Sequence, residues 1–150
     1  MAFPPLSLKG RALRLLAQRE HSRAELAAKL ARHVQEGEDL DAVLQDLQAK
    51  GFIDEARVAE SLLHRRGPRL GTQRLLQELR SKGLSEDLVR AQAAGLRATE
   101  FERALAVWRQ RFGSPAATPQ ERARHMRFLA ARGFSGEVVR RVVRGADEDF

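Results

Sequence analysis

Apolar residues recur along this chain at intervals of three and four positions, which is the spacing of one face of an α-helix. The clearest run is Leu40, Val43, Leu44 and Leu47, which fall at positions i, i+3, i+4 and i+7. Strict alternation of apolar and polar residues, the pattern of a half-buried β-strand, is almost absent. The pattern therefore predicts an all-α protein.

Polar residues mark where these helices begin and glycines mark where they end. Ser22 with Glu25, and Thr118 with Glu121, form capping-box sequences, in which each side chain can satisfy the other residue's backbone N–H. Pro119 occupies a first helical position, where its missing N–H costs nothing. Further helices are expected to begin after Asp54, Ser85, Thr99 and Ser135. Left-handed helix ends are expected at Gly51, Gly83 and Gly133.

The chain also repeats itself at an interval of about fifty residues. Residues 79–85 read Leu-Arg-Ser-Lys-Gly-Leu-Ser and return at 129–135 as Leu-Ala-Ala-Arg-Gly-Phe-Ser, and a fainter copy lies around Leu26 and Leu30. Such a period is typical of small units that each bury an apolar face partly against a neighbour. We predict nine helices in three tandem three-helix repeats, which form an elongated, curved array. The predicted repeats are residues 1–53, 54–98 and 99–150.

Composition narrows the class of protein. The 150 residues include no cysteine, which excludes disulfides and thiolate-bound metals. No apolar run is long enough to span a membrane, and residues 1–5 lead into no apolar segment of a secretion signal. We therefore expect a soluble, cytoplasmic protein with no membrane partner.

The charge is strongly positive, at +7, and only four of the 27 basic residues are lysines. Arginine's planar guanidinium pairs bidentately with phosphates and carboxylates. Residues 1–53 carry 8 basic and 7 acidic residues, 54–98 carry 9 and 6, and 99–150 carry 10 and 7, which places the positive field mainly in the second and third repeats. This basicity indicates a polyanionic partner, nucleic acid or an assembly coated with it. A genome whose codons favour arginine is the alternative explanation.

Residue types that perform catalysis are not grouped. The four histidines lie far apart, and no glycine-rich phosphate loop or paired-carboxylate arrangement is present. The acidic run 36–41 could hold a hard metal ion, but a solvated loop with a helix cap is the simpler interpretation. Phe101, Trp108 and Phe112 share one helical face with aliphatic residues, which favours core packing over base stacking. We therefore expect neither an enzyme nor a site for a metal or cofactor.

Several segments combine into a recognisable series of motifs. Residues 51–59 read Gly-Phe-Ile-Asp-Glu-Ala-Arg-Val-Ala, 78–84 read Glu-Leu-Arg-Ser-Lys-Gly-Leu, and 127–134 read Arg-Phe-Leu-Ala-Ala-Arg-Gly-Phe, after opening segments at 12–19 and 22–26. In this order and spacing the chain resembles, over essentially its whole length, the RecX family of bacterial regulators of the RecA recombinase. It departs from the family at Val58, where an aromatic residue is common, and at Arg69, where the family often has glycine.

The resemblance implies a modular, curved, all-helical and non-enzymatic protein that lies in the groove of the RecA–single-stranded-DNA filament. There it would span adjacent protomers and inhibit filament growth, ATP hydrolysis, strand exchange and coprotease activity. The alternative function is direct binding of single- or double-stranded DNA, independently of RecA, by tandem helix-turn-helix-like units. A scaffold for another acidic protein is a third possibility. We expect a monomer.

Basic side chains supply the expected contact surface, because they crowd the turn at 65–69 and recur on the helices that follow. The residues expected to contact the filament or DNA are Arg57, Arg65, Arg66, Arg69, Arg74, Arg80, Lys82, Arg127, Arg132, Arg140 and Arg141. A charge run is usually a solvated face, so some of these cations could instead pair with acids of the same chain. Lys82 and Arg132 could also serve only to complement a helix dipole.

Overall fold

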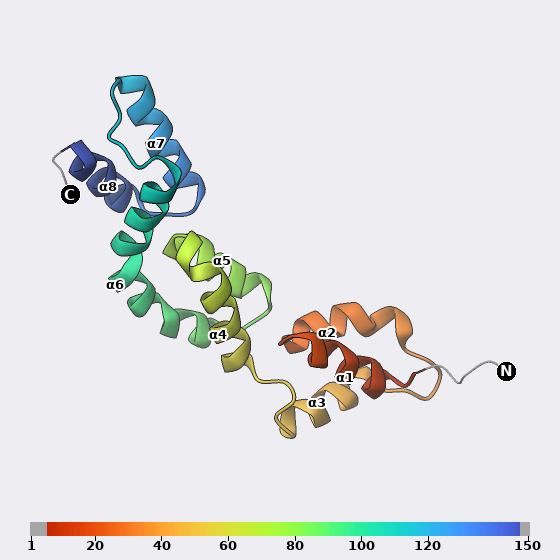
Figure 1. The fold of residues 1–150 in the computed structure, drawn as a ribbon. Helices are drawn as coiled ribbons and strands as arrows, with labels where there is room; N and C mark the ends of the chain where they lie inside the picture. The colour runs from red at the N-terminus through yellow and green to blue at the C-terminus, as the bar shows by residue number, and fades with distance from the viewer. Residues whose placement is uncertain (1–5, 148–150) are drawn as a thin grey trace. The chain divides into compact units, whose positions relative to one another are not determined.

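The computed structural model describes residues 6–147, and every regular element within them is helical (Figure 1). In chain order the elements are α1 (Leu8–Gln18), α2 (Arg23–Leu30), the 3₁₀-helix η1 (Ala31–His33), α3 (Leu40–Ala49), α4 (Glu55–Arg66), the 3₁₀-helix η2 (Gly67–Arg69), α5 (Thr72–Ser81), α6 (Glu86–Arg111), α7 (Pro119–Ala131) and α8 (Gly136–Asp147). The prediction of an all-α protein is confirmed. None of these described helices is long and apolar enough to cross a membrane.

Local signals act at the helix ends as the sequence predicts. The Ser22 hydroxyl accepts the Glu25 N–H at 3.0 Å while the Glu25 carboxylate accepts the Ser22 N–H at 3.1 Å, which completes a capping box. Thr118 caps α7 by accepting the Glu121 N–H at 3.1 Å, but the Glu121 carboxylate accepts the N–H of Ala117, one residue further out, at 2.7 Å. The three expected helix-ending glycines all have positive φ, at Gly51, Gly83 and Gly133.

The helices pack into two compact units, described here one at a time. The first unit comprises Met1–Ser61 and Ser81–Leu84, and the second comprises Leu62–Arg80 and Ser85–Phe150. In the first unit, helices α1, α2 and α3 bury a cluster of Leu8, Ala12, Leu26, Leu30, Leu44, Leu47 and Ile53. The segment Ser81–Leu84 is tied to this unit because the Ser22 hydroxyl donates to the Lys82 carbonyl oxygen and the Lys82 ammonium pairs with Glu25 at 3.0 Å.

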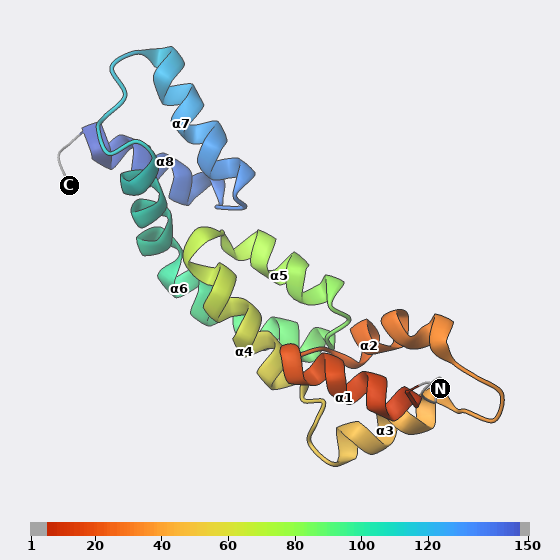
Figure 2. The same ribbon diagram turned by 45° about the vertical axis from the view of Figure 1, so that its right-hand side comes forward.

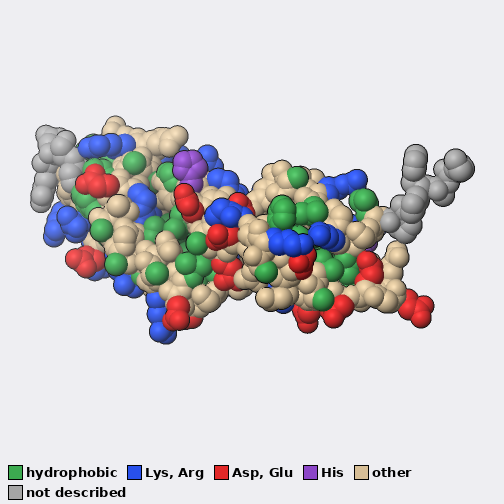
Figure 3. All heavy atoms as spheres, turned by 90° about the horizontal axis from the view of Figure 1, so that it is seen from below, with side chains coloured by type: hydrophobic (Ala, Val, Ile, Leu, Met, Phe, Trp, Pro, Cys, Tyr) green, Lys and Arg blue, Asp and Glu red, His purple; other side chains and the backbone are tan. Residues whose placement is uncertain are grey.

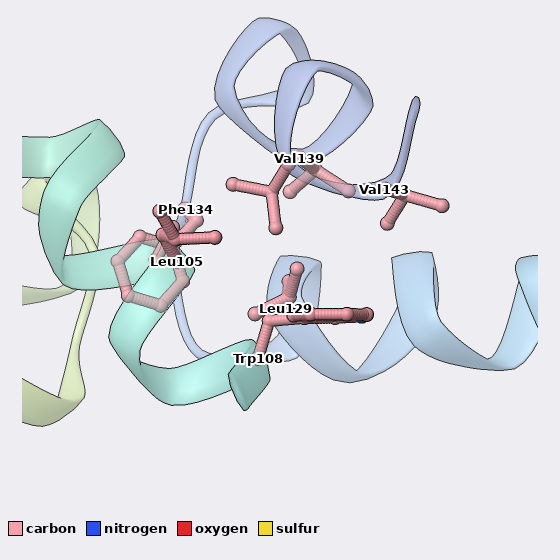
Figure 4. Packing of buried hydrophobic residues seen from close by; sticks show 8 residues of the cluster. Leu105, Trp108, Leu129, Phe134, Val139 and Val143 are labelled. Carbon is pink, nitrogen blue, oxygen red and sulfur yellow. The ribbon is translucent and has the colours of Figure 1, made fainter. Parts of the chain in front are cut away.

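The second unit has its main core where α6, α7 and α8 meet. Trp108 of α6 and Leu129 of α7 face Val139 and Val143 of α8, with Leu105 and Phe134 beside them (Figure 4). The Trp108 indole N–H donates to Nδ1 of the buried His125 at 3.2 Å, so the ring's polar atom is satisfied inside the core. Trp108 is therefore a core residue, as its place on an apolar helical face indicates.

Helix α6 differs from the prediction. It runs unbroken through 26 residues, from beside α5 to α7 and α8 (Figure 2). The expected new helix after Thr99 does not exist, because the Thr99 hydroxyl donates to the carbonyls of Gly95 and Leu96, one turn back, instead of capping. No proline interrupts residues 86–111 and four alanines lie between Arg90 and Thr99, so the helix continues. The prediction of nine helices is wrong, and residues 6–147 hold eight α-helices.

A candidate arginine groove in the second unit

A half-buried arginine fixes the turn that carries the first group of cations. Arg103 of α6 donates to the carbonyl oxygens of Gly67 at 3.3 Å, of Leu96 at 2.7 Å and of Leu70, and to the Thr72 hydroxyl at 3.2 Å. Burial lowers the pKa of Arg103, although the nearby Glu100 carboxylate opposes this shift. Glu100 itself accepts the Thr72 backbone N–H at 2.8 Å. These bonds hold η2 and the start of α5 against α6, so Arg69 projects from a fixed backbone.

The same turn is joined to the α7–α8 corner. The Gly71 N–H donates to the carbonyl oxygen of Arg132, the residue that ends α7, at 2.9 Å. Arg69 and Arg132 are 63 positions apart in the sequence, but this bond places their backbones next to each other. The two arginines therefore belong to one surface only because of the tertiary fold.

Two hollows open on this surface, and they share Arg69 and Arg132. One has a volume of about 590 Å³ and is lined by His64, Arg65, Arg66, Arg69, Leu70 and Arg132. The other has a volume of about 380 Å³ and is lined by Arg69, Val107, Gln110, Arg111, Phe128 and Arg132. No described Asp or Glu lines either of them. We call the two hollows together the arginine groove.

Guanidiniums in the second hollow are oriented by an aromatic ring. The Arg132 Cζ lies 4.9 Å from the centre of the half-buried Phe128 ring, and the Arg111 Cζ lies 5.4 Å from it. Phe112 meets Phe128 edge-on at 5.4 Å and steadies it. A guanidinium over a ring face keeps its N–H donors, so these two arginines can still bind an anion at their edges.

The lining cations differ in how far the chain already neutralises them. Arg66 pairs with Glu78 at 2.6 Å, and this hydrogen bond raises the pKa of Arg66. By contrast, Arg65, Arg69, Arg111 and Arg132 make no ion pair with any acid among residues 6–147. The groove therefore presents four uncompensated guanidiniums and one compensated one.

Three family models match consecutive parts of the chain. The model described as "RecX, first three-helix domain" matches residues 9–47, the second-domain model matches 54–91, and the third-domain model matches 98–143. The chain belongs to the RecX family. The predicted tandem arrangement of three three-helix units is thereby confirmed, although the exact limits of the three repeats stay a prediction.

Relatives that carry the RecX name match this chain over nearly its full length. It is 56% identical to "Regulatory protein RecX" of Leptothrix cholodnii, covering 97% of this chain and 93% of that one. It is 50% identical to the protein of the same name from Ralstonia nicotianae, covering 98% and 94%. The crystal structure of RecX from Lactobacillus salivarius has the same fold, with a TM-score of 0.74 at 17% identity over 94% and 95% of the two chains. These relatives are named as regulatory proteins, in line with the expected non-enzymatic role.

The seven other predicted contact residues of this RecX-family protein lie outside the groove, and several have partners. In the first unit Arg57 pairs with Glu20 at 3.0 Å and Lys82 pairs with Glu25. In the second unit Arg74 lies 3.8 Å from Glu78, Arg80 pairs with Glu86 at 2.8 Å, and Arg141 covers the Phe101 ring at 4.2 Å. Arg127 and Arg140 are exposed and line neither hollow. The structure thus groups Arg65, Arg66, Arg69 and Arg132 from the predicted set.

Sequence reasoning missed Arg111, Gln110 and His64, which also line the groove. The sequence did contain one signal for the position of the groove. Phe128 and Arg132 are four residues apart, a spacing that on a helix can place a cation over a ring. Arg111 carried no such signal, because it reaches the groove only through the unbroken course of α6.

The acidic run at 36–41 proves to be a loop with a helix cap. The Glu38 carboxylate accepts the backbone N–H groups of Leu8 and Gln35, and Asp39 caps α3 by accepting the N–H of Ala42. Within the described residues no three His, Asp or Glu side chains gather closely enough to hold a metal ion.

On the face of the molecule shown in Figure 3, basic and acidic side chains are interspersed. Where positive charge is left uncompensated therefore depends on which cations pair with an acid.

Proposed function

We propose that this chain binds the RecA–single-stranded-DNA filament and inhibits the recombinase, ATPase and coprotease activities of RecA. The observation that carries the proposal is the arginine groove, because four guanidiniums without an acidic partner converge there from three separate parts of the chain. A filament that carries DNA offers phosphates and carboxylates, and the guanidinium fork binds both groups. Membership of a family of regulatory proteins supports a modulator over an enzyme.

The groove is suited to a polyanion rather than to a small substrate. Half of the residues that line it are arginines, beside three apolar side chains, one amide and one histidine, whereas a small-molecule pocket is typically apolar with few polar groups. A repeated, partly exposed row of guanidiniums can follow successive phosphates or carboxylates along a polymer. Binding of this kind requires no catalytic group and leaves the bound polymer chemically unchanged.

The decisive experiment measures single-stranded-DNA-dependent ATP hydrolysis by RecA while this protein is titrated in. We expect inhibition well below one molecule per RecA. The variant Arg65→Glu with Arg69→Glu should raise the half-inhibitory concentration about tenfold or more, since two attractions become repulsions. Arg109→Glu with Arg124→Glu is the matched control, because both residues are exposed and neither lines the groove. Equal inhibition by the two variants would remove the groove from the mechanism.

Direct DNA binding is the second candidate, favoured by the half-buried Phe128 ring among the arginines. Binding to bare DNA should weaken steeply with salt, with a slope of roughly 0.7 to 0.9 log units per log of salt for each phosphate neutralised. Filament binding should instead require RecA and its nucleotide. Tight, salt-sensitive binding to bare oligonucleotides without any effect on RecA would make this second function the correct one.

A further inference from the structure

A second basic hollow lies in the first unit, where the sequence places little net charge. It has a volume of about 490 Å³ and opens between α1 and α2–η1. Arg11 and Arg14 lie three residues apart on α1, and Lys29 and Arg32 lie three residues apart at the end of α2 and in η1. Residues spaced this way share a helix face, so each helix presents a pair of cations to the hollow.

None of these four cations forms an ion pair within the described chain. The acids of the first unit that form ion pairs do so with other basic residues, for example Asp46 with Lys9 and Lys50, and Glu25 with Arg19. Among residues 6–147, no Asp or Glu lines the hollow. Although basic and acidic residues are nearly equal in number in this unit, positive charge is therefore in local excess at the hollow.

The positive charge around the hollow also affects His33, which lines it. Partial burial, and then the charges of Arg11 and Arg32, lower the pKa of His33. The Arg32 Nε–H donates to the His33 Nε2 at 3.3 Å, which requires that nitrogen to be unprotonated. The neighbouring cations thus disfavour the charged imidazole, and an incoming carboxylate would raise its pKa.

The floor of the hollow is apolar. Leu15 and Leu30 line it, and Leu6 at its edge is 39% exposed, which makes it one of the few large apolar side chains that face solvent in residues 6–147. No described aromatic residue other than His33 lines the hollow, so it offers little platform on which a nucleic-acid base could stack. A phosphate backbone would leave Leu6 and the exposed part of Leu15 in contact with water, whereas a peptide side chain would cover them.

We propose that this hollow docks an acidic segment of a protein partner, with carboxylates held by Arg11, Arg14, Lys29 and Arg32 and an apolar side chain seated on the exposed parts of Leu6 and Leu15. The partner is recognised by the combination of charge and apolar contact, because two pairs of cations flank the leucine floor. This surface is separate from the arginine groove and does not depend on the function proposed for it.

The test uses the full chain and a fluorescein-labelled peptide in which glutamates alternate with leucines. Two comparison probes are the same peptide with glutamine at every glutamate, and an oligo(dT) of similar length. We expect the acidic peptide to bind, the glutamine peptide to bind at least about tenfold more weakly, and the oligonucleotide not to compete for this hollow.

Variants locate the binding. Arg14→Glu with Arg32→Glu should weaken the acidic peptide about tenfold, and Leu6→Ser should weaken it severalfold, because Leu6 is exposed and its loss does not disturb the core. Arg109→Glu with Arg124→Glu, which changes the same charge in the second unit, should leave the affinity unchanged. The His33 pKa, followed by NMR, should rise when the acidic peptide is bound and stay unchanged with the glutamine peptide.

Three results would overturn the proposal. One is peptide affinity that is the same in the Arg14/Arg32 variant and the wild type. Another is oligo(dT) binding that is tighter than peptide binding and is lost in that variant, which would assign the hollow to nucleic acid. The third is a His33 pKa that does not move on saturation with the acidic peptide. Because RecA is absent and the substituted residues lie in the first unit, none of these outcomes tests the inhibition of RecA proposed for the arginine groove.

Discussion

The backbones of Gly71 and Gly133 lie so close that a Cβ on Gly71 would come within 2.2 Å of the carbonyl carbon and oxygen of Gly133. This approach is what lets the Gly71 N–H reach the Arg132 carbonyl and what brings Arg69 beside Arg132. The obstacle at Gly71 is backbone rather than the end of a flexible side chain, so it cannot be moved cheaply. The arginine groove therefore depends on a residue that carries no charge.

We predict that Gly71→Ala lowers the free energy of unfolding by about 1–3 kcal/mol or more, because the added methyl group must push two backbone segments apart. Gly95→Ala is the matched control. Gly95 lies inside α6, and a Cβ there would meet nothing within 4 Å, so alanine should raise the free energy of unfolding by about 0.5–1 kcal/mol. Urea denaturation measures both, and a loss of stability at Gly95 equal to that at Gly71 would contradict the explanation.

Arg103 should be essential to the turn that carries Arg69. Replacing it with methionine keeps most of its volume but removes the side-chain donor to the carbonyls of Gly67 and Leu70, so the free energy of unfolding should fall by about 2–4 kcal/mol. Arg97→Met, at an exposed position of the same helix, should change it by no more than about 0.5 kcal/mol. Equal effects of the two substitutions in chemical denaturation would show that the hydrogen bonds of Arg103 contribute little.

Glu25 should govern part of the stability in acid. Burial alone would raise the pKa of Glu25, but hydrogen bonds from the Ser22 N–H, Lys82 and Arg19 outweigh it and bring the pKa to about 2. Since the folded pKa is below the unfolded value, this carboxylate stabilises the fold above about pH 4.5, and the contribution is lost as the pH falls towards 2. We expect Glu25→Gln to flatten the stability curve over that range.

A second substitution checks the cause. Lys82→Gln removes one of the donors that lower the folded pKa of Glu25, so the loss of stability in acid should be smaller, and complete at a higher pH, than in the wild type. Thermal melting temperatures followed by circular dichroism across pH 2 to 6 measure both variants, with the pH range set by the titration of a carboxylate. Curves that superimpose on the wild type, apart from a constant offset, would exclude Glu25 as the titrating group.

We expect Glu78 to reduce the positive charge at the edge of the arginine groove. Its carboxylate lies 2.6 Å from Arg66 and 3.8 Å from Arg74, so it neutralises cations at the edge of the arginine groove. Glu78→Gln should therefore lower the concentration needed to inhibit RecA, by about two- to threefold at low salt and less at high salt, where charges are screened. Glu102→Gln, an exposed acid of α6, should leave that concentration unchanged. Weaker inhibition by Glu78→Gln would mean that Glu78 positions the groove rather than neutralising it.

Features set by residues three or four positions apart were predictable from the sequence. The capping box of Ser22 and Glu25 and the left-handed turns at Gly51, Gly83 and Gly133 form as expected, because each depends on a single helical turn. The tandem repeat was also visible, since it is a copy of the sequence itself. The helix start expected at Thr99 failed because a threonine hydroxyl can bond back to its own helix as easily as it can cap a new one.

The functional surface, by contrast, was decided by tertiary structure. The sequence identified Arg65, Arg66, Arg69 and Arg132 as basic, but only the meeting of Gly71 with Gly133 puts them on one surface, and only the unbroken course of α6 adds Arg111. Likewise, the sequence could not show that Glu78 neutralises Arg66 while the four cations around the hollow in the first unit stay unpaired. Charge is a property of a residue, but uncompensated charge depends on which acid lies within about 4 Å, and that distance is set by packing between segments far apart in the chain.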